Sequence, residues 1–104
     1  MDRIAKLKEF LQLNPTDSFV QHALALEYVK TGDEVNARLQ FEALLEREPA
    51  YIGSYYHLGK LLERIGEKNG AIKMYDKGME EAKKAGDEKN YRELRGVYEE
   101  LSDK

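Results

Sequence analysis

Two histidines are the side chains of this chain best suited to bind a metal ion. His22 and His57 lie 35 positions apart in a sequence of 104 residues. A zinc site in a protein usually has at least three side-chain ligands, drawn from cysteine, histidine and carboxylates. The chain has no cysteine, and no third ligand accompanies the two histidines at a spacing typical of zinc sites. We therefore expect no metal, and we interpret both histidines as surface or partner-contacting residues.

No arrangement of residues predicts catalysis. The sequence contains no G-x-S-x-G, no H-E-x-x-H and no Walker-type glycine loop. The stretch "IGEKNGAIK" (65–73) lacks the G-K-[ST] ending of a phosphate loop and follows a predicted helix, so we interpret it as a turn. The stretches "GDEVN" and "GDEKN" lack the alternating oxygen ligands of a calcium loop. We expect a chain that is not an enzyme and binds no cofactor.

The charge and hydropathy patterns exclude two classes of partner. The formal net charge is -3, and the longest basic runs are pairs such as Lys83 and Lys84, which argues against binding to a phosphate backbone. No stretch approaches eighteen apolar residues, and the first fifteen residues contain no apolar signal region. We therefore expect neither nucleic acid nor membrane as a partner. The absence of cysteine suits a reducing compartment, and we expect a cytoplasmic location.

The sequence predicts that helices position the two histidines and the other side chains of the chain. Apolar residues recur three and four positions apart along nearly the whole chain and nowhere alternate over the length of a strand. Helix breakers and helix-capping residues divide this pattern. They are Pro15, Pro49, Gly32, Gly66, Gly86, Asp33 and Asp87. The pattern predicts helices over residues 2–13, 17–31, 34–47, 51–65, 68–85 and 88–101. Connections this short favour antiparallel packing of neighbouring helices.

Residues 18–51 and 52–85 form two copies of one pattern. The turn "TGDEVNA" (31–37) returns as "IGEKNGA" (65–71), which is 34 residues later. Four positions are identical between the copies. They pair Leu24 with Leu58, Gly32 with Gly66, Ala37 with Ala71 and Glu46 with Glu80. Repetition at this interval is typical of a helical solenoid.

The two copies resemble the tetratricopeptide repeat family, whose pattern is a bulky residue, then L-G, Y, A, F and P. The first copy, containing "QHALALEYV", matches at Leu24, Ala25, Tyr28, Ala37, Phe41 and Pro49. The second, containing "YYHLGKLLE", matches at Tyr55, Leu58, Gly59, Leu62, Ala71 and Tyr75. Gln21 replaces the aromatic residue expected in the first copy, and Lys83 stands where the proline of the second copy would be.

The resemblance implies an all-α fold, an alpha-alpha superhelix of six antiparallel helices in a single domain over residues 1–104. Residues 1–17 would form the second helix of a preceding half-repeat, and residues 86–104 a capping helix. Small residues would let neighbouring helix axes approach closely. They are Ala25, Ala37, Gly59, Ala71 and Gly78. Apolar residues of the terminal helices, such as Ile4, Leu7, Leu11, Tyr91, Leu94 and Tyr98, would seal the ends of the stack.

One face of the helix over 17–31 has no obvious partner. Each helical residue advances about 100°, so that Phe19, His22, Leu26 and Val29 lie opposite Leu24. Three of these four are apolar. In the family this side of each first helix lines a concave groove that binds partner segments. The residues of the candidate groove are Phe19, His22, Leu26, Val29, Tyr56, His57, Lys60, Glu63 and Arg64.

An apolar strip beside a polar strip suits an amphipathic peptide or helix. We therefore predict a protein-protein interaction scaffold that binds a segment of another protein in this groove. One alternative is a homodimer that uses the same apolar strip as its interface. Another is that the C-terminal helix covers the strip.

Some family members bind the C-terminal carboxylate of heat-shock chaperones with lysine, arginine and asparagine side chains in this groove. In this chain Leu26 and His57 stand where that binding needs asparagine, and His22 stands where it needs lysine. We therefore do not predict binding of chaperone tails.

Overall fold

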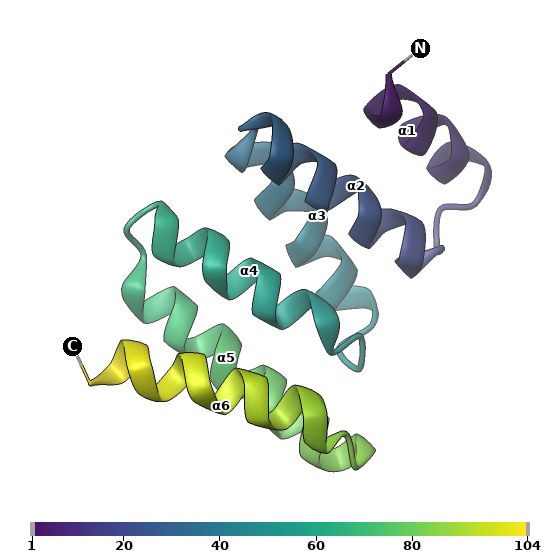
Figure 1. The fold of residues 1–104 in the computed structure, drawn as a ribbon. Coiled ribbons are helices and arrows are strands. Elements are labelled where there is room, and N and C mark those ends of the chain that lie inside the picture. The colour runs from purple at the N-terminus through teal and green to yellow at the C-terminus, as the bar shows by residue number, and fades with distance from the viewer. Residues whose placement is uncertain (1, 104) are drawn as a thin grey trace. The chain divides into compact units, whose positions relative to one another are not determined.

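The computed structural model describes residues 2–103, and all regular secondary structure in this range is helical (Figure 1). The helices are α1 (Arg3–Leu13), α2 (Ser18–Thr31), α3 (Glu34–Arg47), α4 (Gly53–Arg64), α5 (Lys68–Ala85) and α6 (Glu88–Ser102). All six predicted helices are confirmed, with ends within two residues of the expected positions. None of the helices among residues 2–103 is long and apolar enough to cross a membrane.

The glycines that follow helices adopt the predicted left-handed conformation. Gly32, Gly66 and Gly86 have φ angles of 84°, 85° and 68°. A residue with a Cβ is strained at such angles, which is why glycine is favoured where a helix ends. Gly32 and Gly86 end α2 and α5, and their backbone N–H groups bond to carbonyls of the last helical turn.

Aspartates cap four of the six helices. The carboxylates of Asp33 and Asp87 accept the backbone N–H three residues later, at 3.1 Å in each case, as predicted. Asp2 and Asp17 cap α1 and α2 in the same way, with distances of 2.7 and 3.0 Å. Each bond satisfies one of the N–H groups that a helix start leaves without a partner.

Two of these caps make the stability of the chain depend on pH. A side-chain hydrogen bond and a backbone hydrogen bond from Asn36 lower the pKa of Asp33, and Asn90 lowers the pKa of Asp87 in the same way. A carboxyl whose pKa is lower in the folded state stabilises that state above the unfolded pKa, about 4. The stabilisation is lost as the pH falls through the folded-state value.

We expect a double variant Asp33→Ala, Asp87→Ala to melt at a lower temperature than the wild type at pH 7. The difference should shrink as the pH falls below about 4, because the wild-type carboxyls become protonated. Circular dichroism melts between pH 7 and pH 2 measure it. The double variant with asparagine at both positions keeps a cap acceptor that does not titrate, and serves as control. A difference between wild type and the alanine variant that stays constant with pH would contradict this account.

The chain divides into two compact units, one ending at Glu48 and the other beginning at Pro49. Each unit holds one of the two predicted repeats with one flanking helix. The boundary lies three residues before the repeat boundary expected at 51/52. The single domain over residues 1–104 remains a prediction.

In the first unit α2 packs against α3 and α1 packs against α2. The core contains the repeat residues Leu24, Ala25, Tyr28, Ala37 and Phe41, each at most 7% exposed. Leu44 and Leu45 of α3 are buried with them. The flanking helix differs from its expectation, since Ile4, Leu7 and Leu11 are only partly buried and α1 has no fully buried residue.

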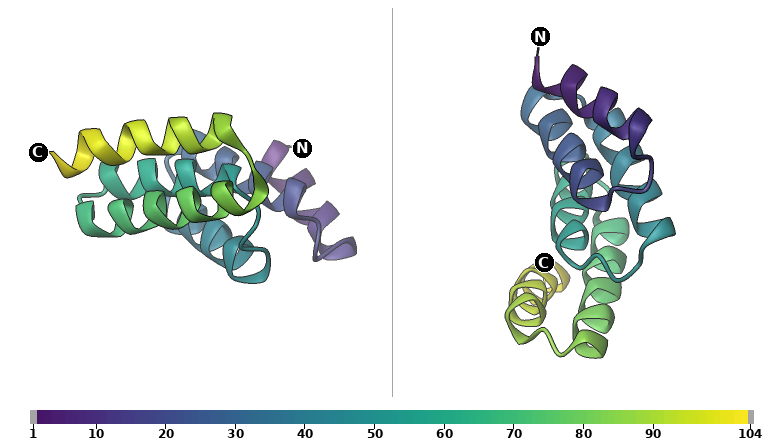
Figure 2. Two further views of the ribbon diagram at one scale, coloured as in Figure 1. Left: turned by 90° about the horizontal axis from the view of Figure 1, so that it is seen from below. Right: turned by 90° about the vertical axis from the view of Figure 1, so that its right-hand side faces the viewer.

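In the second unit α5 packs against both α4 and α6, as can be followed in Figure 1 and Figure 2. The predicted close approach at small residues is confirmed there. A Cβ added at Gly78 would lie 2.7 Å from Cβ of Tyr55 and 2.9 Å from Cδ1 of Leu94. The helix axes can therefore stay at this distance only while residue 78 has no side chain.

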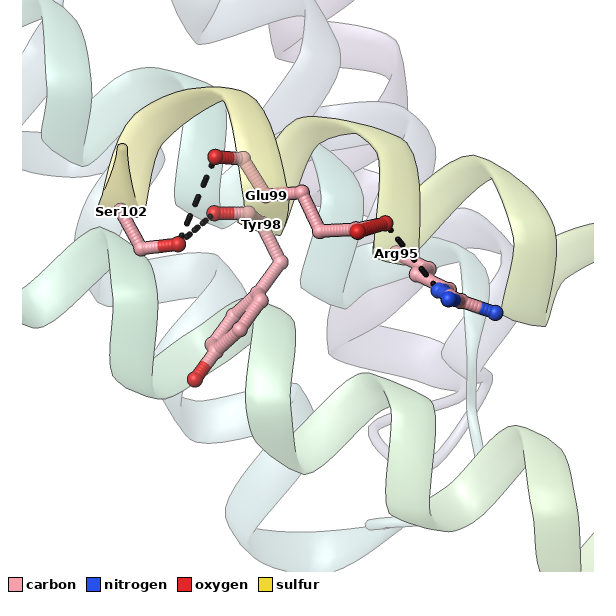
Figure 3. Close-up of polar contacts among 4 residues, drawn as sticks. All are labelled: Arg95, Tyr98, Glu99 and Ser102. Carbon is pink, nitrogen blue, oxygen red and sulfur yellow. Dashed lines mark hydrogen bonds and ion pairs between the residues drawn. The ribbon is translucent and has the colours of Figure 1, made fainter. Parts of the chain in front are cut away.

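Side chains near the C-terminal end of α6 bond to other residues of the same helix. The Ser102 hydroxyl donates to the carbonyl of Tyr98 at 2.7 Å, and Arg95 pairs with Glu99 one turn apart at 3.1 Å (Figure 3). The inward residues Leu94 and Leu101 are buried, while Tyr91 and Tyr98 are partly buried. The apolar face of α6 is thus used in packing within its own unit.

Candidate functional site

The outward face of α2 was predicted to be apolar and exposed. Phe19 is 73% exposed, and Leu26 and Val29 are partly exposed. On the opposite side Leu24 and Tyr28 are 2% and 7% exposed. Positions 19, 22, 26 and 29 share one face because they are three or four residues apart. The helix is therefore apolar on both sides, although only one side is packed in the core.

His22 lies on this outward face but also contacts the core. Its ring is 5.8 Å from the ring of Phe41, in an edge-to-face arrangement. Phe41 is fully buried on α3. Such aromatic pairs add about 0.5 to 1.5 kcal/mol beyond the burial of area. His22 therefore helps to fix the orientation of the outward face as well as contributing to its surface.

The candidate residues on α4 form one connected cluster. The rings of Tyr56 and His57 are 5.5 Å apart and nearly perpendicular. Lys60 places its Nζ 5.9 Å from the centre of the Tyr56 ring and 3.7 Å from Oε2 of Glu63. A lysine in this position is attracted both by the face of the ring and by the carboxylate. Lys60 thus links an aromatic group to an anionic group along the helix.

Glu63 is held from the core side by Tyr75. The Tyr75 hydroxyl donates a hydrogen bond to Oε2 of Glu63. The tyrosine is fully buried, and its burial, followed by this hydrogen bond, raises the pKa of Tyr75 well above its ordinary value. The phenol therefore remains a proton donor at neutral pH. Glu63 has its orientation set by this bond and its charge partly balanced by Lys60.

The remaining two candidate residues of α4 differ in environment. His57 is partly buried, and this burial lowers the pKa of its imidazole. The neutral imidazole therefore predominates at pH 7. The folded state loses stability once the pH falls below the ordinary histidine pKa and through the lowered folded-state value, because the buried ring must then take up a proton. Arg64 is exposed at the end of α4. The α4 face thus presents the ring pair of Tyr56 and His57, the ion pair of Lys60 and Glu63, and the exposed guanidinium of Arg64.

Solved structures identify the fold and the family. The chain is similar to a tetratricopeptide repeat domain protein from Salinibacter ruber, with 40% sequence identity and a TM-score of 0.81. The match covers 84% of this chain and 88% of that one. The chain belongs to the tetratricopeptide repeat family. The predicted all-α repeat superhelix is thereby confirmed as its fold class.

More distant tetratricopeptide repeat structures share the fold. The TPR2B domain of yeast Sti1, solved as a complex with pHsp70, has 16% identity and a TM-score of 0.87. The match covers 96% of this chain and 80% of that one. The TPR domain of Sgt2 from Aspergillus fumigatus has 19% identity and a TM-score of 0.73, with coverages of 97% and 69%. Neither a scan against family models nor a search of curated proteins gave a match.

The tetratricopeptide repeat position that usually holds an aromatic residue holds the amide of Gln21 in the first repeat. Gln21 is 8% exposed and donates to Oε1 of Gln40 at 3.2 Å. Its own Oε1 accepts from Arg47 at 2.7 Å, and Arg47 also donates to Ser18 at 2.8 Å. Ser18 donates in turn to Glu48 at 3.1 Å. A buried amide is tolerated here because both ends are hydrogen-bonded.

No cluster of three or more histidine, cysteine, aspartate or glutamate side chains suited to a metal ion occurs in the part of the chain that the structure describes. His22 belongs to the first unit and His57 to the second. Two sets of hydrogen bonds near the candidate site, from Tyr75 to Glu63 and around Gln21, were not predicted from the sequence. Two features of the sequence point to them. Tyr75 stands where the first repeat has Phe41 and adds a hydroxyl there, and Gln21 stands where the family pattern has an aromatic residue.

Proposed function

We propose that this chain is a non-catalytic interaction module that binds an amphipathic segment of another protein. The outward face of α2 is the proposed binding surface, and the polar residues of α4 from Tyr56 to Arg64 are a second candidate surface. The observation that carries the proposal is the 73% exposure of Phe19 next to the partly exposed Leu26 and Val29. Exposed apolar surface rimmed by polar residues marks interaction sites in many proteins.

The chemistry of the two faces supports an amphipathic partner. Phe19, Leu26 and Val29 can bury apolar side chains, which is the main source of binding free energy. Lys60 and Glu63 are already paired with each other at 3.7 Å, so they favour a polar or zwitterionic segment over a strongly charged one. The location that we propose is the cytoplasm, because the chain has no cysteine.

The partner of the yeast Sti1 domain is not carried over to this chain. That domain was solved with pHsp70, but at 16% identity the similarity concerns the fold alone. The groove residues of this chain also lack the side chains that chaperone tails require, because His22, Leu26 and His57 replace the lysine and asparagines. We therefore propose a partner other than a chaperone C-terminus.

Affinity capture with matched variants tests this function. Immobilised wild type, Leu26→Lys and Leu39→Lys are each incubated with lysate of the native organism, and the retained proteins are quantified. Leu39 is an apolar residue on α3 that is 55% exposed, so the same substitution there controls for added charge. We expect proteins that the wild type and Leu39→Lys retain but Leu26→Lys loses at least tenfold. Equal retention by all three would overturn the proposed function.

The homodimer alternative is tested by solution mass. A wild type that is a dimer and a Val29→Glu variant that is a monomer would show that the α2 face is a self-association interface. Monomers in both cases leave the face open to another protein. The other alternative, a C-terminal helix that covers the apolar face of α2, stays a prediction.

A further inference from the structure

The first unit contains a cavity that is separate from the proposed binding faces. It has a volume of about 320 Å³, is open to solvent, and is lined by residues of α1, α2, α3 and the α1–α2 connection. None of its lining residues is among the outward residues of α2 or α4. A different cavity of about 150 Å³, engineered in another protein, holds benzene. The cavity in this chain is thus large enough for an aromatic ring.

The second repeat has an aromatic ring at the position that corresponds to Gln21, a lining residue of this cavity. Thirty-four residues after Gln21 stands Tyr55, which is 4% exposed and donates its hydroxyl to the carbonyl of Pro49 at 2.7 Å. Thirty-four residues before Pro49 stands Pro15, which lines the cavity together with Gln21. The first unit therefore has a proline, Pro15, at the position equivalent to Pro49, but has Gln21 where the second repeat has the phenol of Tyr55.

The side chains of the lining are suited to such a ring. Leu11 and Leu24 provide apolar contact, and Leu24 is 2% exposed. The amides of Gln21 and Gln40 are bonded to each other at 3.2 Å, so this part of the wall is already ordered. Lys8 is the charged residue of the lining, and no carboxylate lines the cavity. The cavity therefore favours a ligand that carries negative charge beside its ring.

We propose that this cavity binds a tyrosine side chain of an acidic segment of a partner protein. The ring lies in the cavity beside the Gln21 side chain, which forms part of the wall, and its hydroxyl donates to the carbonyl of Pro15. An acidic residue next to the tyrosine pairs with Lys8. This inference concerns a second site and does not depend on the proposed role of the α2 face.

Titration of ¹⁵N-labelled protein with three short peptides tests the proposal. The peptide acetyl-Glu-Tyr-Glu-amide is expected to shift the amide signals of the cavity residues in a saturable way. Acetyl-Glu-Phe-Glu-amide, which lacks the hydroxyl, should bind about three- to tenfold more weakly. Acetyl-Lys-Tyr-Lys-amide, with reversed charge, should bind at least about threefold more weakly than the acidic tyrosine peptide. The absence of a saturable shift up to the solubility limit of the first peptide would overturn the proposal.

Two variants locate the binding in the cavity. Gln21→Tyr fills the cavity with the ring of the second repeat and should abolish the peptide-induced shifts. Lys8→Glu changes an exposed residue and should reverse the preference between the acidic and the basic peptide. Leu26→Lys should leave the titration unchanged, which separates this site from the α2 face. Shifts of equal size in wild type, Gln21→Tyr and Lys8→Glu would show that the peptides bind elsewhere and would reject the proposal.

Discussion

Replacing Gly59 with leucine is expected to destabilise the chain by about 3 kcal/mol, the upper end of the usual cost of overpacking. A Cβ at position 59 would overlap Cε1 of Tyr75 and lie 2.7 Å from its Cδ1. The Tyr75 ring has little room to move, because it is fully buried and its hydroxyl is bonded to Glu63. The substitution must therefore separate α4 from α5 or expel the ring. The fall in melting temperature should be about 10 to 20 °C.

Gly53→Leu is the matched control for this experiment. Gly53 is also in α4, but a Cβ added there would meet nothing within 4 Å. The control should therefore keep a melting temperature close to that of the wild type, and the two variants differ only in the surroundings of the added side chain. An unchanged melting temperature for Gly59→Leu would contradict the packing of Tyr75 against α4.

The arrangement of the helices was predictable because local chemistry and the repeat agree. The glycines at 32, 66 and 86 end helices through a backbone conformation that other residues adopt rarely, and the sequence displays them directly. The close approach of helices at Gly59 and Gly78 was predicted from their small size, but the rings that lie against them, Tyr75 and Tyr55, are known only from the structure. Sequence periodicity was less reliable for α1. Its apolar residues predict a packed face, but α1 has no fully buried residue, whereas the other flanking helix, α6, buries Leu94 and Leu101.

The outward face of α2 was predictable for a different reason. Once Leu24 is assigned to the core, helical geometry places Phe19 on the opposite side, and its exposure follows. The partners of polar side chains were not predictable in this way. The bonds from Tyr75 to Glu63 and from Arg47 to Gln21 join residues 12 and 26 positions apart. Such bonds depend on rotamers and on neighbouring helices, which periodicity does not specify.

Two phenylalanines in the first unit separate stability from binding. Phe41 is fully buried on α3, whereas Phe19 is 73% exposed on α2. We expect Phe41→Ala to lower the free energy of unfolding by about 3 to 5 kcal/mol, because it removes a buried ring and leaves a cavity. The same substitution at Phe19 should change it by no more than about 0.5 kcal/mol. Urea unfolding followed by circular dichroism measures both values.

The effects on partner capture should follow the opposite order. Phe19→Ala removes apolar area from the proposed binding face and should reduce retention of the partner, although the variant is as stable as the wild type. Phe41→Ala leaves Phe19 in place, so below its unfolding temperature any loss of capture should match the fraction of chain that is unfolded. The contact of the Phe41 ring with His22, at 5.8 Å, also links the core substitution to the outward face. If the Phe19→Ala variant retained partners as well as the wild type, Phe19 would not be part of the binding surface. Because the variant is expected to be as stable as the wild type, a change in folding could not mask a loss of binding.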